Sequence, residues 1–201
     1  EHLFVPALLG APVALLTGNH VLAHNLVALL SLALAGLGMY LLARELLGGD
    51  GPGPFAAGLF YAFHTWNQNE LIRLQILSNQ WFPFLLLALL RYFQGPSWRR
   101  AGAVAGFYLL QSLSCMYWAL YAPLLLLAAL PALQWRLRLS VRRLVPLATA
   151  LLAAAVLLAP FFVPYWRSSR QLDLVREAPE ALDLARYLDV RAGSPYEAWL
   201  G

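Results

Sequence analysis

A polar segment between two apolar stretches carries the residue types that could do chemistry. Residues 64–81 read HTWNQNELIRLQILSNQW, with one carboxylate, one guanidinium and six amides: Asn67, Gln68, Asn69, Gln75, Asn79 and Gln80. Glu70 and Arg73 are three residues apart, a spacing at which two side chains on a helix can pair. A guanidinium binds phosphate through parallel N–H groups, and amides can bind hydroxyls. The segment therefore has the groups to hold the headgroup of a sugar phosphate.

Two interpretations of the polar segment, residues 64–81, follow from these residues. In the first, the segment lines a cavity that binds substrate, with Arg73 as the contact for an anion. The candidate substrate-binding residues are His64, Asn67, Glu70, Arg73, Gln75 and Gln80. In the second, the segment is a hydrated loop whose amides cap the ends of two helices. His64, Asn67 and Glu70 share a face if the segment is helical, and the sequence leaves both interpretations open.

The stretches that flank the polar segment are apolar enough for a lipid bilayer. The chain has 201 residues, of which 61% are hydrophobic and 12% are charged. A soluble domain is about 45–50% apolar and about 25% charged. About 20 helical residues cross a hydrocarbon core, and apolar runs of that length recur, for example at residues 21–43 and 144–163. The sequence therefore predicts an all-α, polytopic transmembrane helical bundle, because an unusually apolar soluble bundle would show polar helix faces.

Arginine placement predicts how the helices cross the membrane, because short cytoplasmic loops carry excess basic residues. Three basic sites are assigned to the cytoplasm: Arg44; Arg91 with Arg99 and Arg100; and Arg136, Arg138, Arg142 and Arg143. Counting crossings between them predicts about six spans, at residues 21–43, 54–66, 76–92, 100–114, 117–134 and 144–163. The fourth and fifth spans require a break within residues 111–118, QSLSCMYW, so that both basic loops are cytoplasmic.

We expect different structures at the two ends of the chain. Residues 3–16 contain Pro6, Gly10 and Pro12 and are too short for an ordinary span, so we expect a re-entrant or interfacial helix at the external face. The transmembrane domain should cover residues 1–166. Residues 167–201 should form an extracytoplasmic tail with a helix at 179–188. Residues 64–80 then also lie outside the cytoplasm, and we expect the protein to be integral to a plasma membrane.

Other residues with chemical potential are weaker candidates. His2, His20 and His24 flank the short apolar helix, and an i,i+4 pair of histidines can share a metal. A pair alone favours histidines that are hydrogen-bonded at the interface. Gly36 and Gly38 are expected to let helices approach closely.

Several classes of function find no support in the sequence. Residues 48–53 are rich in glycine but lack the Lys and Ser/Thr of a phosphate-binding P-loop. The single Cys115 excludes an internal disulfide. The net charge of +4 does not indicate a nucleic-acid partner, and no metal or cofactor is assigned to the chain.

A series of segments resembles uncharacterised bacterial multi-spanning proteins of the GT-C glycosyltransferase superfamily. The segments are LLTGNHVLAHNL, GLGMYLLARELLG, LQILSNQWFPFLLLALLRY and LLQSLSCMYWALY, with the best matches at Gln75, Gln80, Trp81 and Pro83. The resemblance implies an enzyme of the bacterial plasma (inner) membrane that transfers a sugar from a polyprenyl-phosphate donor at the extracytoplasmic face. In that superfamily the catalytic carboxylate lies in the first external loop, which would fall before Glu1. The resemblance thus implies a fragment without its first span and catalytic carboxylate, and leaves open a divalent metal in the complete enzyme.

The rival expectation is a transporter or another non-enzymatic membrane protein. Transporters also use broken helices near a binding site. They usually carry ionisable groups near the midplane of the membrane, for which Glu70 is the only candidate acid between Asp50 and Asp173.

Overall fold

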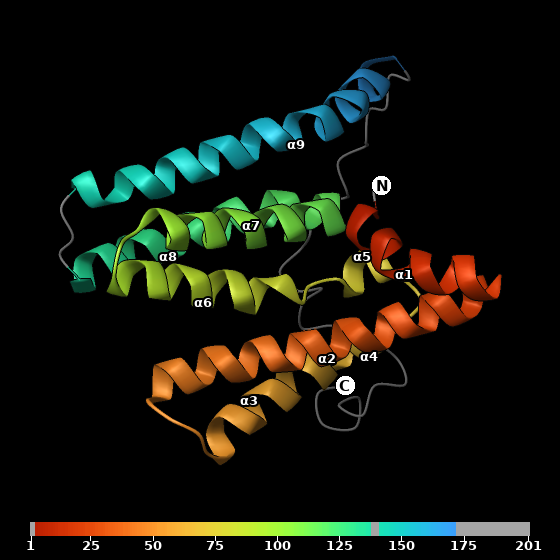
Figure 1. The fold of residues 1–201 in the computed structure, drawn as a ribbon, viewed down its shortest axis with the longest axis horizontal. Coiled ribbons are helices and arrows are strands. Elements are labelled where there is room, and N and C mark those ends of the chain that lie inside the picture. The colour runs from red at the N-terminus through yellow and green to blue at the C-terminus, as the bar shows by residue number, and fades with distance from the viewer. Residues whose placement is uncertain (1–2, 138–140, 172–201) are drawn as a thin grey trace, which may run out of the picture. The chain divides into compact units, whose positions relative to one another are not determined.

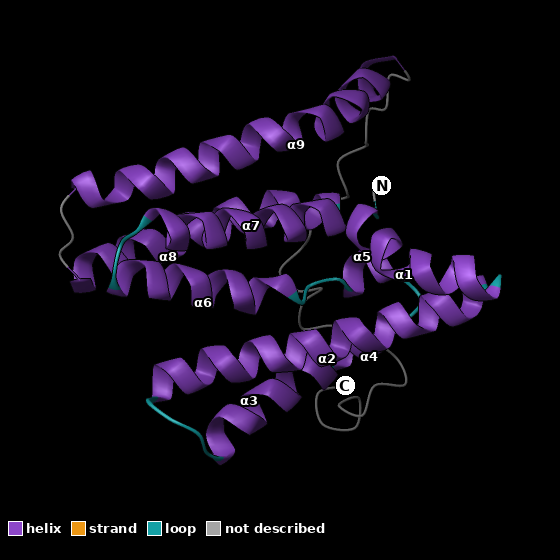
Figure 2. Ribbon diagram, viewed as in Figure 1, coloured by secondary structure: helices purple, strands orange, loops and turns teal. Residues whose placement is uncertain are grey.

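The computed structural model describes residues 3–137 and 141–171, and all regular elements in these ranges are helical. The helices are α1 (Phe4–Thr17), α2 (His20–Leu47), α3 (Pro52–Phe63), α4 (Thr65–Asn69), α5 (Leu74–Leu77), α6 (Trp81–Gln94), α7 (Trp98–Ser114), α8 (Met116–Leu137) and α9 (Val145–Gln171), with a 3₁₀ turn at Val141–Leu144 (Figures 1 and 2). The all-α prediction is confirmed for these ranges. The predicted helix at 179–188 lies outside them.

The chain divides into two compact units, Glu1–Phe162 and Val163–Gly201. All the sites described below lie in the first unit.

Two of the described helices are long and apolar enough to cross a membrane, His20–Leu47 and Arg142–Pro164. Both coincide with predicted spans and support membrane association. The prediction of six spans is not confirmed, because α3 and α6 have 12 and 14 residues. At 1.5 Å per residue they reach only about 18 and 21 Å, less than a hydrocarbon core of about 30 Å.

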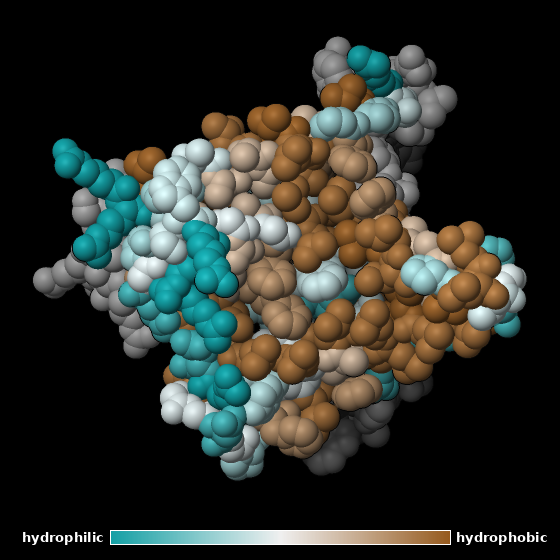
Figure 3. Space-filling model, viewed as in Figure 1, coloured by the Kyte–Doolittle hydropathy of each residue, from teal (hydrophilic) through white to brown (hydrophobic). Residues whose placement is uncertain are grey.

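The surface of the first unit also favours an apolar environment. Leu152, Val156 and Leu157 of α9 are each more than 60% exposed. Figure 3 shows that hydrophobic residues cover much of the visible face, whereas hydrophilic residues gather at one end of it. Large contiguous apolar surfaces are rare on soluble monomers and mark membrane or protein interaction.

The predicted break within residues 111–118 is confirmed. Cys115 alone separates α7 from α8, and its backbone is extended, with φ −162° and ψ 140°. The two helices then pack against each other (Figure 1). One extended residue is therefore enough to reverse the chain.

Two other helix boundaries were predicted wrongly. Residues 54–66 are not one helix, because α3 ends at Phe63 and His64 is extended, with φ −65° and ψ 155°. Residues 76–92 are not one helix either, because residues 78–80 separate α5 from α6. Pro83 explains the second break. A proline lacks the N–H that a helix interior needs, but it fits the first turn of a helix, which is where α6 places it.

Small residues bring α2 close to its neighbours, as expected for Gly36 and Gly38. A Cβ on Gly36 would lie 3.3 Å from the Ala62 Cβ of α3, and a Cβ on Gly58 would lie only 2.7 Å from the Gly36 carbonyl oxygen. A Cβ on Gly38 would lie 2.9 Å from the Phe84 ring of α6. Such close backbone approach is typical of helix packing in membranes. These contacts set α2 between α3 and α6.

Candidate functional site

The polar segment begins by closing the end of α3. The last carbonyls of a helix have no partner within the helix. Here Asn67 Nδ2 donates to the Tyr61 and Ala62 carbonyl oxygens at 3.0 and 3.1 Å, and Gln68 Nε2 donates to the Phe63 carbonyl oxygen at 2.7 Å. The predicted role of these amides as helix caps is therefore present at α3.

The break before α6 is held by a glutamine from a distant helix. Gln111 of α7 is buried. Its Nε2 donates to the Ser78 carbonyl oxygen at 2.7 Å, and its Oε1 accepts from the Trp81 backbone N–H at 3.2 Å. One side chain thus replaces two backbone hydrogen bonds that a continuous helix would have made.

Two aromatic side chains complete this support. The Tyr61 hydroxyl of α3 donates to the Asn79 carbonyl oxygen at 3.2 Å, and Trp118 Nε1 of α8 donates to the Ile76 carbonyl oxygen at 3.2 Å. Side chains from three helices, α3, α7 and α8, therefore hydrogen-bond to the backbone of residues 76–81. No sequence pattern indicated this role for Tyr61. Gln111 and Trp118, in contrast, are the first and last residues of the motif that predicted the α7–α8 break.

Much of the polar segment is buried rather than hydrated. Asn67, Ser78 and Gln80 are fully buried, and Glu70 and Asn79 are each 5% exposed. Asn79 Nδ2 donates to Asn67 Oδ1 at 2.8 Å. For these five residues, a hydrated loop is not an adequate description.

Several buried polar atoms of this segment lack a partner among the residues that the structure describes. They are both amide atoms of Gln80, Asn79 Oδ1, Ser78 Oγ and Trp81 Nε1. An unsatisfied buried donor or acceptor costs about 1–3 kcal/mol, and ordered water commonly satisfies such groups. The segment therefore has buried hydrogen-bond donors and acceptors that no described residue satisfies.

The ion pair expected between Glu70 and Arg73 is present. Arg73 Nε lies 2.8 Å from Glu70 Oε2, and the two side chains are 58% and 6% exposed, respectively. The residues are joined across a turn rather than along a helix, because Arg73 N–H donates to the Glu70 carbonyl oxygen at 2.9 Å. The Arg73 Nη1 and Nη2 groups contact no acceptor within the described ranges. A buried carboxylate thus anchors one edge of a guanidinium whose other edge faces outward.

The remaining candidate residues are not joined to this pair. His64 is exposed and its Nδ1 lies 2.9 Å from the Tyr61 carbonyl oxygen. Gln75 is half-buried on α5. In the part of the chain that the structure describes, no hydrogen bond or ion pair connects Arg73 to His64, Gln75 or Gln80.

Of the three histidines that flank the short apolar helix, His24 is hydrogen-bonded as expected. His24 Nε2 lies 3.3 Å from the Leu71 carbonyl oxygen, a bond in which the Nε2-protonated tautomer donates, and this bond ties α2 to the polar segment. Within the described residues no group of three His, Cys, Asp or Glu side chains could hold a metal ion. His2 lies outside those residues.

An aromatic hollow adjoins the polar segment. It has a volume of about 160 Å³ and is lined by Trp66, Ile76, Cys115, Tyr117, Trp118 and Tyr121. These residues come from α4, α5, the α7–α8 break and α8. Aromatic side chains offer a broad apolar face with a specific charge distribution, so the hollow suits a flat ring with C–H groups.

Comparisons with protein-family models, with curated proteins and with solved structures found no match to this chain.

Proposed function

We propose that this chain is part of an integral membrane glycosyltransferase of the GT-C type, which transfers a sugar from a polyprenyl-phosphate donor at the extracytoplasmic face. The observation that carries the proposal is the asymmetry of the Glu70–Arg73 pair. The buried Glu70 engages only the Nε edge of Arg73. Within the described ranges the Nη groups have no acceptor, so they can bind phosphate oxygens, which accept strong, charge-assisted hydrogen bonds from a guanidinium.

The aromatic hollow beside the polar segment supplies surface for the sugar. The aromatic hollow at Trp66 and Trp118 offers ring faces for the C–H face of a pyranose. Gln80 is fully buried and does not line this hollow, so we assign its amide no contact with the sugar. Asn67 acts as a cap and as the support of Asn79, so we assign it a positioning role.

The reaction would be a direct displacement. An acceptor hydroxyl oxygen bonds to the anomeric carbon of the sugar, and the bond from that carbon to the phosphate oxygen breaks. The lipid phosphate leaves with the electron pair, and Arg73 stabilises its negative charge. The hydroxyl proton passes to a carboxylate that the family resemblance places upstream of Glu1. No catalytic base is therefore assigned to this chain.

Binding of the donor by Arg73 variants tests the proposal. In the complete protein, Arg73→Ala should weaken binding of a polyprenyl-phosphate sugar roughly tenfold or more, since hydrogen bonds to charged groups contribute about 1.5–3 kcal/mol. Arg73→Lys should restore part of the affinity, because an ammonium cannot form the bidentate fork. Titration of the donor into detergent-solubilised protein measures both.

The matched control is Arg142→Ala, which removes an exposed arginine that lies outside the polar segment. It should leave donor affinity unchanged. If Arg73→Ala binds the donor as the parent protein does, the polar segment is only a structural support and the proposal is wrong.

A transporter is the second candidate, because two helix breaks meet at one buried polar site. Gln111 lies near the end of α7, next to the α7–α8 break, and holds the break before α6. Transporters build substrate sites from broken helices in this way. Reconstituted vesicles discriminate between the two. Transfer of labelled sugar from the lipid carrier to an acceptor supports the enzyme, whereas passage of an unmodified solute across the bilayer supports the transporter.

A further inference from the structure

A larger hollow runs along α6, from Phe84 near its start to Arg91 near its end. Its volume is about 560 Å³, and α2, α6 and α7 provide its walls. Ligand sites for drug-sized molecules have volumes of about 300–1,000 Å³, so the hollow has room for far more than a small ion.

The walls of this hollow are apolar. Leu41 of α2 and Leu87 of α6 contribute aliphatic surface. Phe84 of α6 and Phe107 of α7 stack with their ring centroids 5.4 Å apart and their planes inclined by 15°. Surface of this kind suits a hydrocarbon chain.

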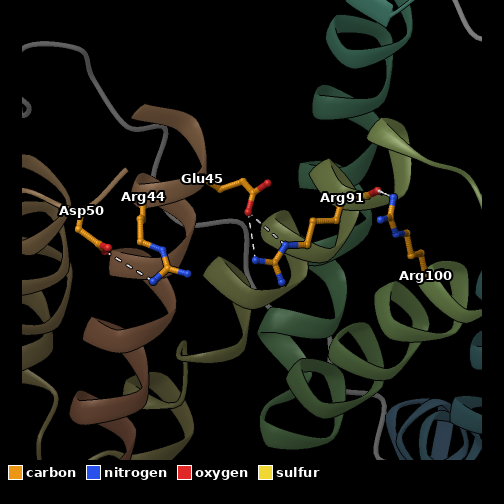
Figure 4. A network of polar contacts seen from close by, with 5 residues as sticks. All are labelled: Arg44, Glu45, Asp50, Arg91 and Arg100. Atoms are coloured by element: carbon orange, nitrogen blue, oxygen red, sulfur yellow. Dashed lines mark hydrogen bonds and ion pairs between the residues drawn. The ribbon is translucent and has the colours of Figure 1, made fainter. Parts of the chain in front are cut away.

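The rim of the hollow is basic. It contains Arg91, Arg99 and Arg100, and the only carboxylate that contacts any of them within the described ranges is Glu45, which accepts from Arg91 Nε and Nη2 at 3.3 and 3.0 Å (Figure 4). Arg99 is exposed and has no described acceptor. Two guanidinium charges therefore remain uncompensated beside an apolar hollow.

Two backbone carbonyl oxygens fix the position of the Arg100 guanidinium. Its Nη1 donates to the Arg91 and Gly95 carbonyl oxygens at 2.7 and 3.0 Å, and Figure 4 shows its contact with Arg91. A Cβ on residue 95 would lie 2.4 Å from this Nη1. Any residue other than glycine at this position would therefore displace the guanidinium. Arg100 Nη2 and Nε have no acceptor among the residues that the structure describes, so their N–H groups can bind another acceptor.

We propose that this hollow binds an anionic phospholipid, with the phosphate at Arg99 and Arg100 and an acyl chain along the apolar walls. Basic pockets between membrane helices bind anionic head groups. A free phosphate ion would satisfy the arginines but leave the Phe84 and Phe107 surface uncovered. The site is separate from the proposed donor site, because Arg73 precedes α6 and Arg99 and Arg100 follow it.

Lipid retention tests this site. The full chain is purified from mixed micelles that contain equal amounts of phosphatidylglycerol and phosphatidylcholine, and the retained lipid is measured by native mass spectrometry. The parent protein should be enriched in phosphatidylglycerol. Arg99→Gln should reduce the enrichment about fivefold, since each basic residue near an anionic lipid contributes about that factor. This variant keeps the Arg100 contacts, so its folding should be unaffected.

Two further variants separate the hollow from general surface charge. Ala103→Phe, which fills the hollow from α7, should also reduce retention although it removes no charge. Arg142→Gln, at an exposed arginine outside the hollow, should not. Equal losses in Arg99→Gln and Arg142→Gln would show nonspecific attraction and overturn the proposal. Displacement of the lipid by millimolar inorganic phosphate would instead assign the site to a free ion, and would also overturn it.

Discussion

The two ends of α6 handle polarity in opposite ways. At its start, neutral amides are buried, and those of Asn67 and of Gln111 from α7 donate to backbone carbonyl oxygens. At its end, arginines are exposed and contact carboxylates and carbonyls on neighbouring elements, as between Arg91 and Glu45. An unpaired charge is far more costly to bury than an amide. The comparison indicates that the start of α6 lies among buried neutral groups and its end among exposed charged groups.

Members of the three basic sites that were predicted to face the cytoplasm lie near one another at the C-terminal end of α6. Arg44 pairs with Asp50, and its neighbour Glu45 pairs with Arg91 (Figure 4). The Tyr92 hydroxyl donates to the Arg143 carbonyl oxygen. Members of all three sites are thus linked by contacts between α2, α6 and the segment before α9. That this end faces the cytoplasm stays a prediction.

Accessibility to a membrane-impermeant thiol reagent gives the largest expected difference between the two ends. Asn69→Cys, in the polar segment, should react from outside intact cells, whereas Ser97→Cys, at the start of α7, should react only after the membrane is opened. Both positions are exposed. The native Cys115 is buried, so the parent protein serves as the unreactive control. Labelling in the reverse pattern would invert the proposed orientation.

Loss of the Gln111 amide should be the most damaging single change to stability. Gln111→Leu leaves the Ser78 carbonyl and the Trp81 N–H buried without partners, at about 1–3 kcal/mol each. We expect the free energy of unfolding in detergent micelles to fall by roughly 2–6 kcal/mol. Asn25→Leu is the control, because Asn25 is exposed on α2 and should tolerate the change. Equal stability of the two variants would mean that the broken backbone does not depend on α7.

Removal of the Glu45–Arg91 pair should have the smallest effect. Exposed ion pairs contribute about 0.2–1 kcal/mol, and the side chains of Glu45 and Arg91 are 27% and 46% exposed. Glu45→Gln should therefore lower the free energy of unfolding by less than about 1 kcal/mol, and by less still at high salt. A loss as large as that of Gln111→Leu would contradict the contrast between the two ends of α6.

Local sequence patterns predicted the features that depend on neighbouring residues. The i,i+3 spacing of Glu70 and Arg73 predicted their ion pair, and the small polar run at 111–118 predicted the α7–α8 break. Both are present. The close approach of Gly36 and the hydrogen bond of His24 were also expected from residue type.

Features that depend on distant residues were not predicted. The breaks at His64 and at residues 78–80 were missed because the neighbouring apolar runs are short for spans, and their helices were expected to continue into the polar residues beside them. The Gln111 side chain meets the backbone of residues 30 and 33 positions away, and no local pattern indicates which carbonyl a distant amide will reach. The hollow at Arg99 and Arg100 needs walls from three helices, so the sequence identified these arginines only as markers of orientation.

The role of Gln111 has a consequence for the timing of synthesis. A ribosome adds about 5–20 residues per second. The 30 residues between Trp81 and Gln111 therefore take roughly 2–6 s to emerge. During that interval α3 can already offer Tyr61 to the Asn79 carbonyl, but the Ser78 carbonyl and the Trp81 N–H still await their partner. Water must serve in its place, so the nascent chain should keep this turn at the aqueous boundary until α7 arrives.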